Sequence, residues 1–344
     1  MKRILPMDGL RGIAVTLVFF VHYAALAQGT PGIGKALAQA GHHGVELFFV
    51  LSGYLIYAAS VSPRLQLGRF LVRRARRIYP TFLAVFLAYL ALSYVFPAES
   101  KIPADPLAAT LYLGANVALL PGLFPIVPMI TVAWSLSYEI GYYLTCPALA
   151  LLLRLRRWPV RVRVAFWLAV AAAGFLWAKG DNLRAVLFVS GILVYECKDL
   201  RVPGWLATLL PAAALVAVGM GVLAGPLKFA VLFVVLGLLC ISVFRGEGPA
   251  RVLSWAPLRW LGEASYSYYL IHGLVLKALA TVVPLPYWWM LVPAYAATIA
   301  GTAVLHYAVE RPFSLAMAGG GTSAAAAPAP EPSAWGAVAR ESGS

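Results

Sequence analysis

The sequence places an arginine and a histidine eleven positions apart at the start of its first apolar segment. Arg11 stands in the stretch MDGLRG (residues 7–12), and an apolar run leads from there to His22. Because a helix rises about 1.5 Å per residue, we expect His22 roughly 16 Å beyond Arg11, near the middle of a bilayer about 30 Å thick. Hydrocarbon penalises ionisable groups, so such a residue is a functional candidate. The pair indicates chemistry, or passage of a solute, inside a membrane.

Glu139 is the carboxylate that we expect beside His22. The stretch TVAWSLSYE (residues 131–139) is predicted to enter the membrane from the outside near Thr131, which places Glu139 about 12 Å deep. His22 is expected about 14 Å from the same face of the bilayer. A carboxylate orients a buried histidine and favours its cationic form, as general-base catalysis requires. We therefore predict a catalytic pair; an interhelical bridge that only holds the bundle together is the alternative.

The composition is that of a polytopic membrane protein. The 344 residues are 62% hydrophobic and only 12% charged, whereas soluble domains carry about 25% charged residues. Spans in lipid must satisfy their backbone internally, so the fold class is predicted to be all-α. The net charge of +14 resides in loops between spans, where basic residues set orientation and contact membrane lipid. No nucleic-acid-binding motif is present, and the three cysteines lack metal or disulfide spacing, so neither nucleic acid nor a metal is expected.

Apolar segments and loop charges predict a bundle of ten transmembrane helices with both termini in the cytoplasm. An eleventh segment, residues 106–127, would place the basic loop at 154–163 outside if it crossed the membrane. It is also rich in Gly and Pro, so we predict a re-entrant or interfacial segment on the outer side. The membrane domain is expected to cover residues 1–313, and the Ala/Gly/Pro/Ser-rich tail at 314–344 to be disordered. The ten predicted spans are 12–28, 44–60, 78–96, 131–153, 163–178, 183–197, 205–223, 226–244, 266–283 and 287–308.

Three arginines follow the second span at helical spacing. Arg69, Arg73 and Arg76 recur every three or four residues and so share one helical face. Guanidinium groups bind phosphate oxygens in bidentate fashion. The cluster is either an anion site or an ordinary positive-inside anchor.

Three other polar features allow two interpretations each. Glu46 is expected near the outer end of its span, as a functional acid or as an interfacial group. The small residues Ser52 and Gly53 favour close helix packing, and His42 and His43 are expected at the surface. His272, about 9 Å inside the cytoplasmic face, either faces the same cavity as His22 or bonds a neighbouring helix. Finally, Glu310 and Arg311 precede Pro312 and are expected to cap a helix.

Six ordered motifs give the chain a resemblance to the membrane-bound acyltransferase family 3. They are MDGLRGIAV with His22, GVELFFVLSGYLI, FLVRRARRIYP, WSLSYE, SYSYYLIH and YAVERPF, and the similarity covers about residues 6–313. The resemblance implies a ten-span bundle in the inner (cytoplasmic) membrane of a bacterium. It also implies transfer of an acyl group, usually acetyl from cytoplasmic acetyl-CoA, to a hydroxyl, commonly of a surface carbohydrate.

The resemblance also implies roles for individual residues. Arg11 and His22 would be essential, and Arg73 and Arg76 would belong to the acyl-CoA site, to which our mechanism adds Arg69. Glu139, with Trp134 and Ser137 nearby, would belong to the catalytic cavity. Glu46 stands where the family usually has Asp, and Tyr54 where it usually has Phe. No fused hydrolase-like domain is expected, so any further acyl-transfer step would need a separate partner.

The predicted function is therefore that of an integral membrane O-acyltransferase with acetyl-CoA as donor and a carbohydrate or glycolipid as acceptor. His22 either deprotonates the acceptor hydroxyl or first accepts the acyl group itself, and its depth permits both. Two alternatives remain. The acceptor could be a small secondary metabolite, or the buried charges could form the pathway of a transporter or flippase for a lipid-linked glycan.

Overall fold

The computed structural model describes residues 4–284 and 286–314, and within these ranges the protein is all-α, without a strand. Ten of the helices in this part of the chain correspond in order to the ten predicted spans. They are α1 (Leu5–Leu26), α3 (Gly44–Ser60), α4 (Leu67–Val95), α6 (Trp134–Leu152), α7 (Val160–Trp177), α8 (Val186–Glu196), α9 (Gly204–Gly219), α10 (Gly225–Phe244), α13 (Ser265–Val282) and α14 (Tyr287–Leu305).

The protein is a multi-pass membrane protein. Six stretches of the described chain are long and apolar enough to cross a membrane by length and composition; α9 is a shorter apolar helix. The tail at 314–344 was predicted to be disordered. Of these residues only Ser314 lies within the described ranges, and it is helical. The six stretches are Leu5–Leu26, Gly32–Ser60, Leu67–Val95, Val160–Trp177, Gly225–Phe244 and Tyr287–Ser314.

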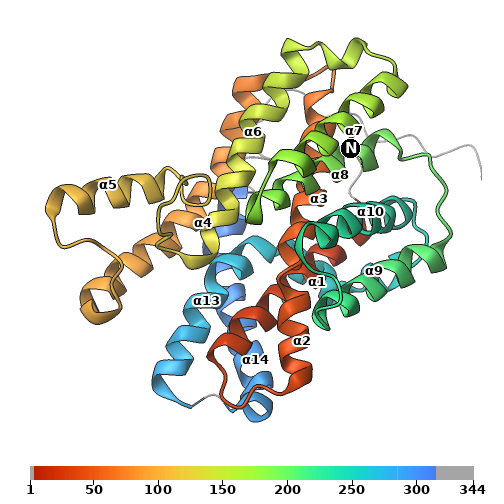
Figure 1. Cartoon of the computed structure of the whole chain (residues 1–344). Coiled ribbons are helices and arrows are strands. Elements are labelled where there is room, and N and C mark those ends of the chain that lie inside the picture. Colours follow the sequence, from red (N-terminus) through yellow and green to blue (C-terminus); the bar gives the residue numbers. More distant parts are fainter. Residues whose placement is uncertain (1–3, 285, 315–344) are drawn as a thin grey trace, which may run out of the picture.

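The segment at 106–127 does not form a spanning helix. It contains α5 (Pro106–Val117), whose 12 residues are too few for a membrane that needs about 20. The buried Asn116 then folds the chain back, because its Oδ1 accepts the amide N–H of Met129 at 2.7 Å. Figure 1 shows α5 projecting sideways, away from the other helices. This position agrees with the interfacial form of the prediction better than with a segment that re-enters between spans.

Short helices complete the bundle where the sequence predicted connections. They are α2 (Gly32–Gly41), α11 (Ala250–Leu253) and α12 (Ala256–Glu263). Brief 3₁₀ turns lie at Pro97–Glu99, Thr131–Ala133, Leu155–Arg157 and Gly180–Ala185, and a π-helical turn at His306–Glu310 extends α14. Such short segments carry too few residues for a hydrophobic period to be recognised.

Helix α1 is held by backbone-to-backbone contact with the short helices near its N-terminus. A Cβ added to Gly12 would lie 2.4 Å from the carbonyl oxygen of Leu258, and one added to Gly262 would lie 1.7 Å from that of Asp8. Both glycines are therefore required by close packing of α1 on α12. The glycines of the MDGLRG motif thus fix the position and rotation of the helix that carries Arg11.

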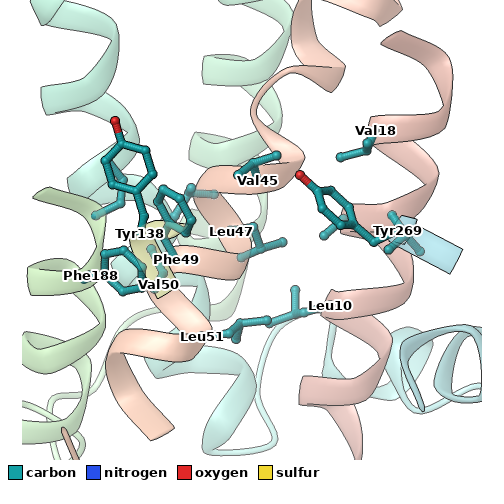
Figure 2. Packing of buried hydrophobic residues seen from close by; sticks show 14 of the residues in the cluster. Leu10, Val18, Val45, Leu47, Phe49, Val50, Leu51, Tyr138, Phe188 and Tyr269 are labelled. Carbon is teal, nitrogen blue, oxygen red and sulfur yellow. The ribbon is translucent and has the colours of Figure 1, made fainter. Parts of the chain in front are cut away.

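Helix α3 is the centre of the molecule, and α8 crosses it at a pair of glycines. Added Cβ atoms would lie 2.1 Å from the Phe188 carbonyl oxygen at Gly53 and 2.0 Å from the Val50 carbonyl oxygen at Gly191. The prediction that Gly53 serves helix packing is therefore confirmed. Figure 2 shows α3 side chains enclosed on one side by Tyr138 and Phe188 and on the other by residues of α1 and Tyr269.

An ion pair joins α7 to α8 beside the C-terminal end of α3. The guanidinium of Arg163 on α7 binds both carboxylate oxygens of Glu196 on α8, at 2.6 and 2.8 Å. The hydroxyl of Tyr57 on α3 donates to the same carboxylate at 2.5 Å. A bidentate pair of this kind fixes geometry as well as charge.

We predict that Gly191→Ala destabilises the protein by about 1–3 kcal/mol, because the new methyl group overpacks the contact between α3 and α8. Gly273→Ala on α13 is the matched control, since the nearest atom to its added Cβ is 3.7 Å away and both changes gain the same helix propensity. Denaturant titration of the detergent-solubilised protein measures the difference. Equal free energies of unfolding for the two variants would contradict the close crossing.

Candidate active site

A cavity lies between α1, α3, α4, α6 and α13. We call it the Arg11 cavity. Hydroxyl, aromatic and guanidinium groups share its wall with apolar side chains. It is lined by Arg11, Val45, Phe48, Phe49, Leu51, Ser52, Leu55, Ile56, Arg74, Arg77, Ile78, Ser135, Leu136, Glu139, Tyr143, Ser265, Tyr266 and Tyr269.

Cationic groups outnumber the acid in the lining of the Arg11 cavity. Arg11, Arg74 and Arg77 face it together with Glu139. The guanidinium of Arg74 lies 5.3 Å from the centre of the Tyr143 ring, within the range of a cation–π contact. Arg11 also interacts electrostatically with Asp8, Glu139 and Glu310 and is repelled by Arg77. The excess of guanidinium groups makes this cavity suited to an anion such as a phosphate.

Glu139 is anchored inside the Arg11 cavity by two hydroxyl groups. Its Oε1 accepts a hydrogen bond from Ser52 at 3.2 Å and another from the hydroxyl of Tyr143, one turn along α6. Ser52 was expected only to allow close packing, so the structure gives it a polar contact as well. Fixed donors of this kind hold the carboxylate in one orientation.

The three arginines chosen from their spacing lie on an exposed face of α4, next to the face that lines the cavity. Arg69, Arg73 and Arg76 are exposed, whereas Arg74 and Arg77 are half-buried and face the cavity. The reason is the helical period, since Arg74 and Arg77 follow Phe70 at four and seven residues, and Phe70 is buried. Arg74 and Arg77 share a helical face with the apolar residue Phe70, and this spacing is the sequence signal that could have identified them. An acyl-CoA site on the three exposed arginines stays a prediction without support from the cavity.

A second cavity, the His22 cavity, lies between α1, α6 and the 3₁₀ turn at Gly180–Ala185. The guanidinium of Arg184 lies 5.2 Å from the centre of the Trp134 ring, and the hydroxyl of Tyr138 donates to Asn182 Oδ1 at 2.6 Å. Arg184 and Asn182 belong to a short polar stretch before an apolar span, which the sequence analysis left aside. The lining residues are His22, His42, Gly122, Pro128, Thr131, Trp134, Tyr138, Asn182 and Arg184.

The two cavities lie along one face of α1 and are divided by its middle turns. Eleven residues make three helical turns and about 20°, so Arg11 and His22 point in nearly the same direction. Val15 and Val18 between them are buried. On α6, Trp134 lines the His22 cavity and Ser135 the Arg11 cavity. The Ser135 hydroxyl lies 2.8 Å from that of Tyr269, so a hydroxyl pair stands where the cavities approach.

The structure does not bring His22 and Glu139 together. They line different cavities, and the ring that His22 contacts is that of His272, at 4.9 Å between centroids. The expected pair is therefore corrected. Depth along the membrane normal agreed for the two residues, but the rise of a helix says nothing about its rotation, and Glu139 turns toward Ser52 and Tyr143.

Two other expected cavity residues face neither cavity. Ser137 is fully buried and donates to the carbonyl oxygen of Pro121, because two residues turn a helix by about 200° and place it opposite Ser135. His272 is fully buried behind His22. Both tie elements together within the bundle.

Glu46 belongs to a buried charged cluster beside the His22 cavity. Its carboxylate Oε1 lies 3.2 Å from Nδ1 of His43 and 3.6 Å from Nη1 of Arg184. His43 is buried, contrary to the surface position expected for it, whereas His42 is exposed and lines the cavity. Glu46 thus supports Arg184 from behind and does not itself line the cavity.

A family model described as an acyltransferase domain matches residues 5–307. The chain belongs to acyltransferase family 3. That span contains both cavities and all their lining residues. Membership supports transfer of acyl groups, in agreement with the motifs. No solved structure matches the chain.

Three curated relatives are similar to most of this chain. A protein named membrane-bound transacylase BcsY, from Komagataeibacter xylinus, is 30% identical over 290 residues, or 77% of this chain and 71% of the relative. The exopolysaccharide production protein ExoZ of Rhizobium meliloti is 30% identical over 276 residues, 71% and 81% of the two chains. Peptidoglycan O-acetyltransferase OatA of Listeria monocytogenes is 26% identical over 345 residues, 86% of this chain but 53% of OatA. The chain thus spans about half the length of OatA.

We expect Glu46→Ala to lower the free energy of unfolding by about 3–5 kcal/mol, because it removes the carboxylate that lies between His43 and Arg184 in the buried cluster. Glu99→Ala is the control. Its carboxylate pairs with Lys277 at 3.2 Å, but both side chains are at least half exposed, so about 0–1 kcal/mol is expected. Denaturant titration in mixed micelles compares the two. A loss for Glu46→Ala no larger than the control's would contradict the buried cluster.

Proposed function

We propose that the protein transfers an acyl group, acetyl in the first instance, from acyl-CoA to a hydroxyl of a cell-surface carbohydrate. The observation that carries this proposal is the pair of cavities along one face of α1, one rich in guanidinium groups and one containing His22. A reaction between a phosphorylated donor and a neutral acceptor needs two such different environments.

The donor is assigned to the Arg11 cavity. Arg74 and Arg77 supply positive charge on its wall, and guanidinium groups suit the phosphate oxygens of coenzyme A. Arg11 lies on α1 itself, one turn before the buried residues that divide the cavities, so a thioester that moves toward the His22 cavity would pass it. We therefore place the donor site on Arg74 and Arg77 instead of the exposed Arg69, Arg73 and Arg76.

The acceptor is assigned to the His22 cavity. The indole of Trp134 offers a flat apolar surface of the kind that packs against a sugar ring, and Asn182, Thr131 and Arg184 offer groups that bond hydroxyls. The names of OatA and ExoZ refer to peptidoglycan and to exopolysaccharide. A carbohydrate acceptor agrees with both the relatives and the lining.

His22 is assigned the central chemical role. In direct transfer an imidazole nitrogen takes the proton of the acceptor hydroxyl, the oxygen attacks the thioester carbonyl, and the C–S bond breaks to release CoA. In the two-step form that nitrogen attacks the thioester carbonyl, and the C–S bond breaks to release CoA. The acyl-imidazole then passes the acyl group to the oxygen of the acceptor, whose proton goes to the freed imidazole nitrogen. Both forms require one unprotonated nitrogen of His22 in the cavity.

Membranes that contain the wild-type protein should transfer radiolabel from acetyl-CoA into a cell-envelope carbohydrate fraction, and His22→Ala at matched expression should lose this transfer at least a hundredfold, because the reacting nitrogen is gone. Label counted after fractionation of the glycan measures the effect. Equal label with both proteins would remove His22 from the reaction and favour passage of a glycan through the bundle.

Arg77→Gln should raise the KM for acetyl-CoA about tenfold or more, since a hydrogen bond to a charged group contributes about 1.5–3 kcal/mol. Arg73→Gln, on the exposed face of the same helix, should change that KM less than twofold. Initial rates against acetyl-CoA concentration give both values. The reverse order would return the donor site to the exposed arginines.

A further inference from the structure

The imidazole of His22 lies against that of a second histidine from a distant part of the chain. The ring of His272 on α13 is 4.9 Å away between centroids, and the two planes are inclined by 64°. His272 has no exposed surface, while His22 faces its cavity. The pair therefore consists of one ring in contact with the cavity and one ring enclosed behind it.

The tautomer of His272 follows from its own hydrogen bond. Its Nδ1 lies 3.1 Å from the carbonyl oxygen of Tyr268, one turn earlier in α13. A carbonyl oxygen can only accept, so Nδ1 carries the hydrogen. In the neutral ring Nε2 then holds a lone pair and must act as an acceptor.

That acceptor has no hydrogen-bond partner among the residues that the structure describes. A buried polar atom without a partner costs free energy, so each such atom in a native protein calls for an explanation. The remaining ring neighbours of His272 are aromatic, with Tyr268 stacked at 5.9 Å and Tyr269 tilted at 5.9 Å. Among these neighbours, His22 is the ring that carries an N–H group.

We propose that the ring of His22 turns within this contact so that its N–H donates to Nε2 of His272, a bond that the two rings do not make in their present orientation. This bond would fix which nitrogen of His22 is unprotonated. A partner of this kind determines the tautomer of a functional histidine. With one nitrogen of His22 engaged by His272, the other keeps its lone pair for the His22 cavity. His272 is a positioning residue, and its effect on the reaction rests on the proposed function.

The assignment gives His272 the part that the sequence had offered to Glu139. A histidine acceptor orients the imidazole without adding a carboxylate charge next to it. Both forms of the reaction need that oriented lone pair, so the loss of His272 should slow turnover and leave donor binding unchanged.

Kinetics of two His272 variants test the positioning role. His272→Phe keeps the ring volume but removes the acceptor, and we expect kcat to fall at least tenfold with the KM for acetyl-CoA within twofold of wild type. His272→Gln can present its amide oxygen near the position of Nε2, and we expect it to recover most of the lost rate. An unchanged kcat in His272→Phe, or equal loss in both variants, would overturn the proposal.

Tyr268→Phe is the matched control on the same helix. The Tyr268 hydroxyl is buried and has no hydrogen-bond partner in the described part of the chain, so its removal should leave kcat within twofold. Size-exclusion chromatography in detergent checks that all three variants fold. A rate loss in Tyr268→Phe equal to that of His272→Phe would assign the effect to packing and overturn the positioning role.

A second readout does not depend on catalysis. The chain has five histidines, so ¹⁵N-histidine labelling gives few NMR signals, and His22→Gln identifies the pair that belongs to His22. We expect one tautomer of His22 in the wild type and a mixture in His272→Phe. If the wild type is active, but the tautomer of His22 is the same in His272→Phe, the result refutes the histidine pair and leaves the proposed function standing. If the wild type transfers no acyl group, but its single His22 tautomer becomes a mixture in His272→Phe, the result refutes the proposed function and leaves the histidine pair standing.

Discussion

The close backbone approach of neighbouring helices to α1 is the contact on which the rest of the structure depends. Glycines on α1 itself and on α12, together with Gly41 and Gly44 at the ends of α2 and α3, let carbonyl oxygens approach where a Cβ would collide. The hydrophobic effect does not drive helices together within lipid, so van der Waals contact at small residues becomes the main interaction that holds them. Because α1 is held on several sides, its rotation is fixed, and Arg11 and His22 face one direction.

A second constraint acts on the polar groups that this packing encloses. Carboxylates within the bundle have specific partners: Glu46 has His43 and Arg184, Glu139 has Ser52 and Tyr143, and Glu310 has Ser267 and His306. The last group lies on the π-helical turn, a local distortion often found at functional sites. Such partners are required because an unpaired charge is costly away from water. They also hold each carboxylate where it can influence a neighbouring arginine or histidine.

The reaction that we propose uses the boundary between two such environments. Three guanidinium groups line the cavity on one side of the middle turns of α1, and aromatic rings, histidines and Arg184 line the cavity on the other. The Ser135–Tyr269 hydroxyl pair stands between them. A thioester and a sugar hydroxyl can meet there without exposing either reactant to bulk water, which favours transfer over hydrolysis. The His22–His272 contact then decides which nitrogen faces that meeting point.

The sequence by itself determined the all-α membrane fold, the ten helical segments and the family, and it marked Arg11 and His22 as candidate site residues. Each follows from local composition, from period or from motifs that lie within one segment. The partner of His22, the arginines of α4 that face the cavity and the opposite orientations of Ser135 and Ser137 were decided only by the tertiary structure. The rise of a helix fixes depth from sequence, whereas rotation about its axis is set by contacts with helices far along the chain. By depth the sequence offered Glu139 as the partner of His22, whereas the packing of α1 against α13 places the ring of His272 beside it.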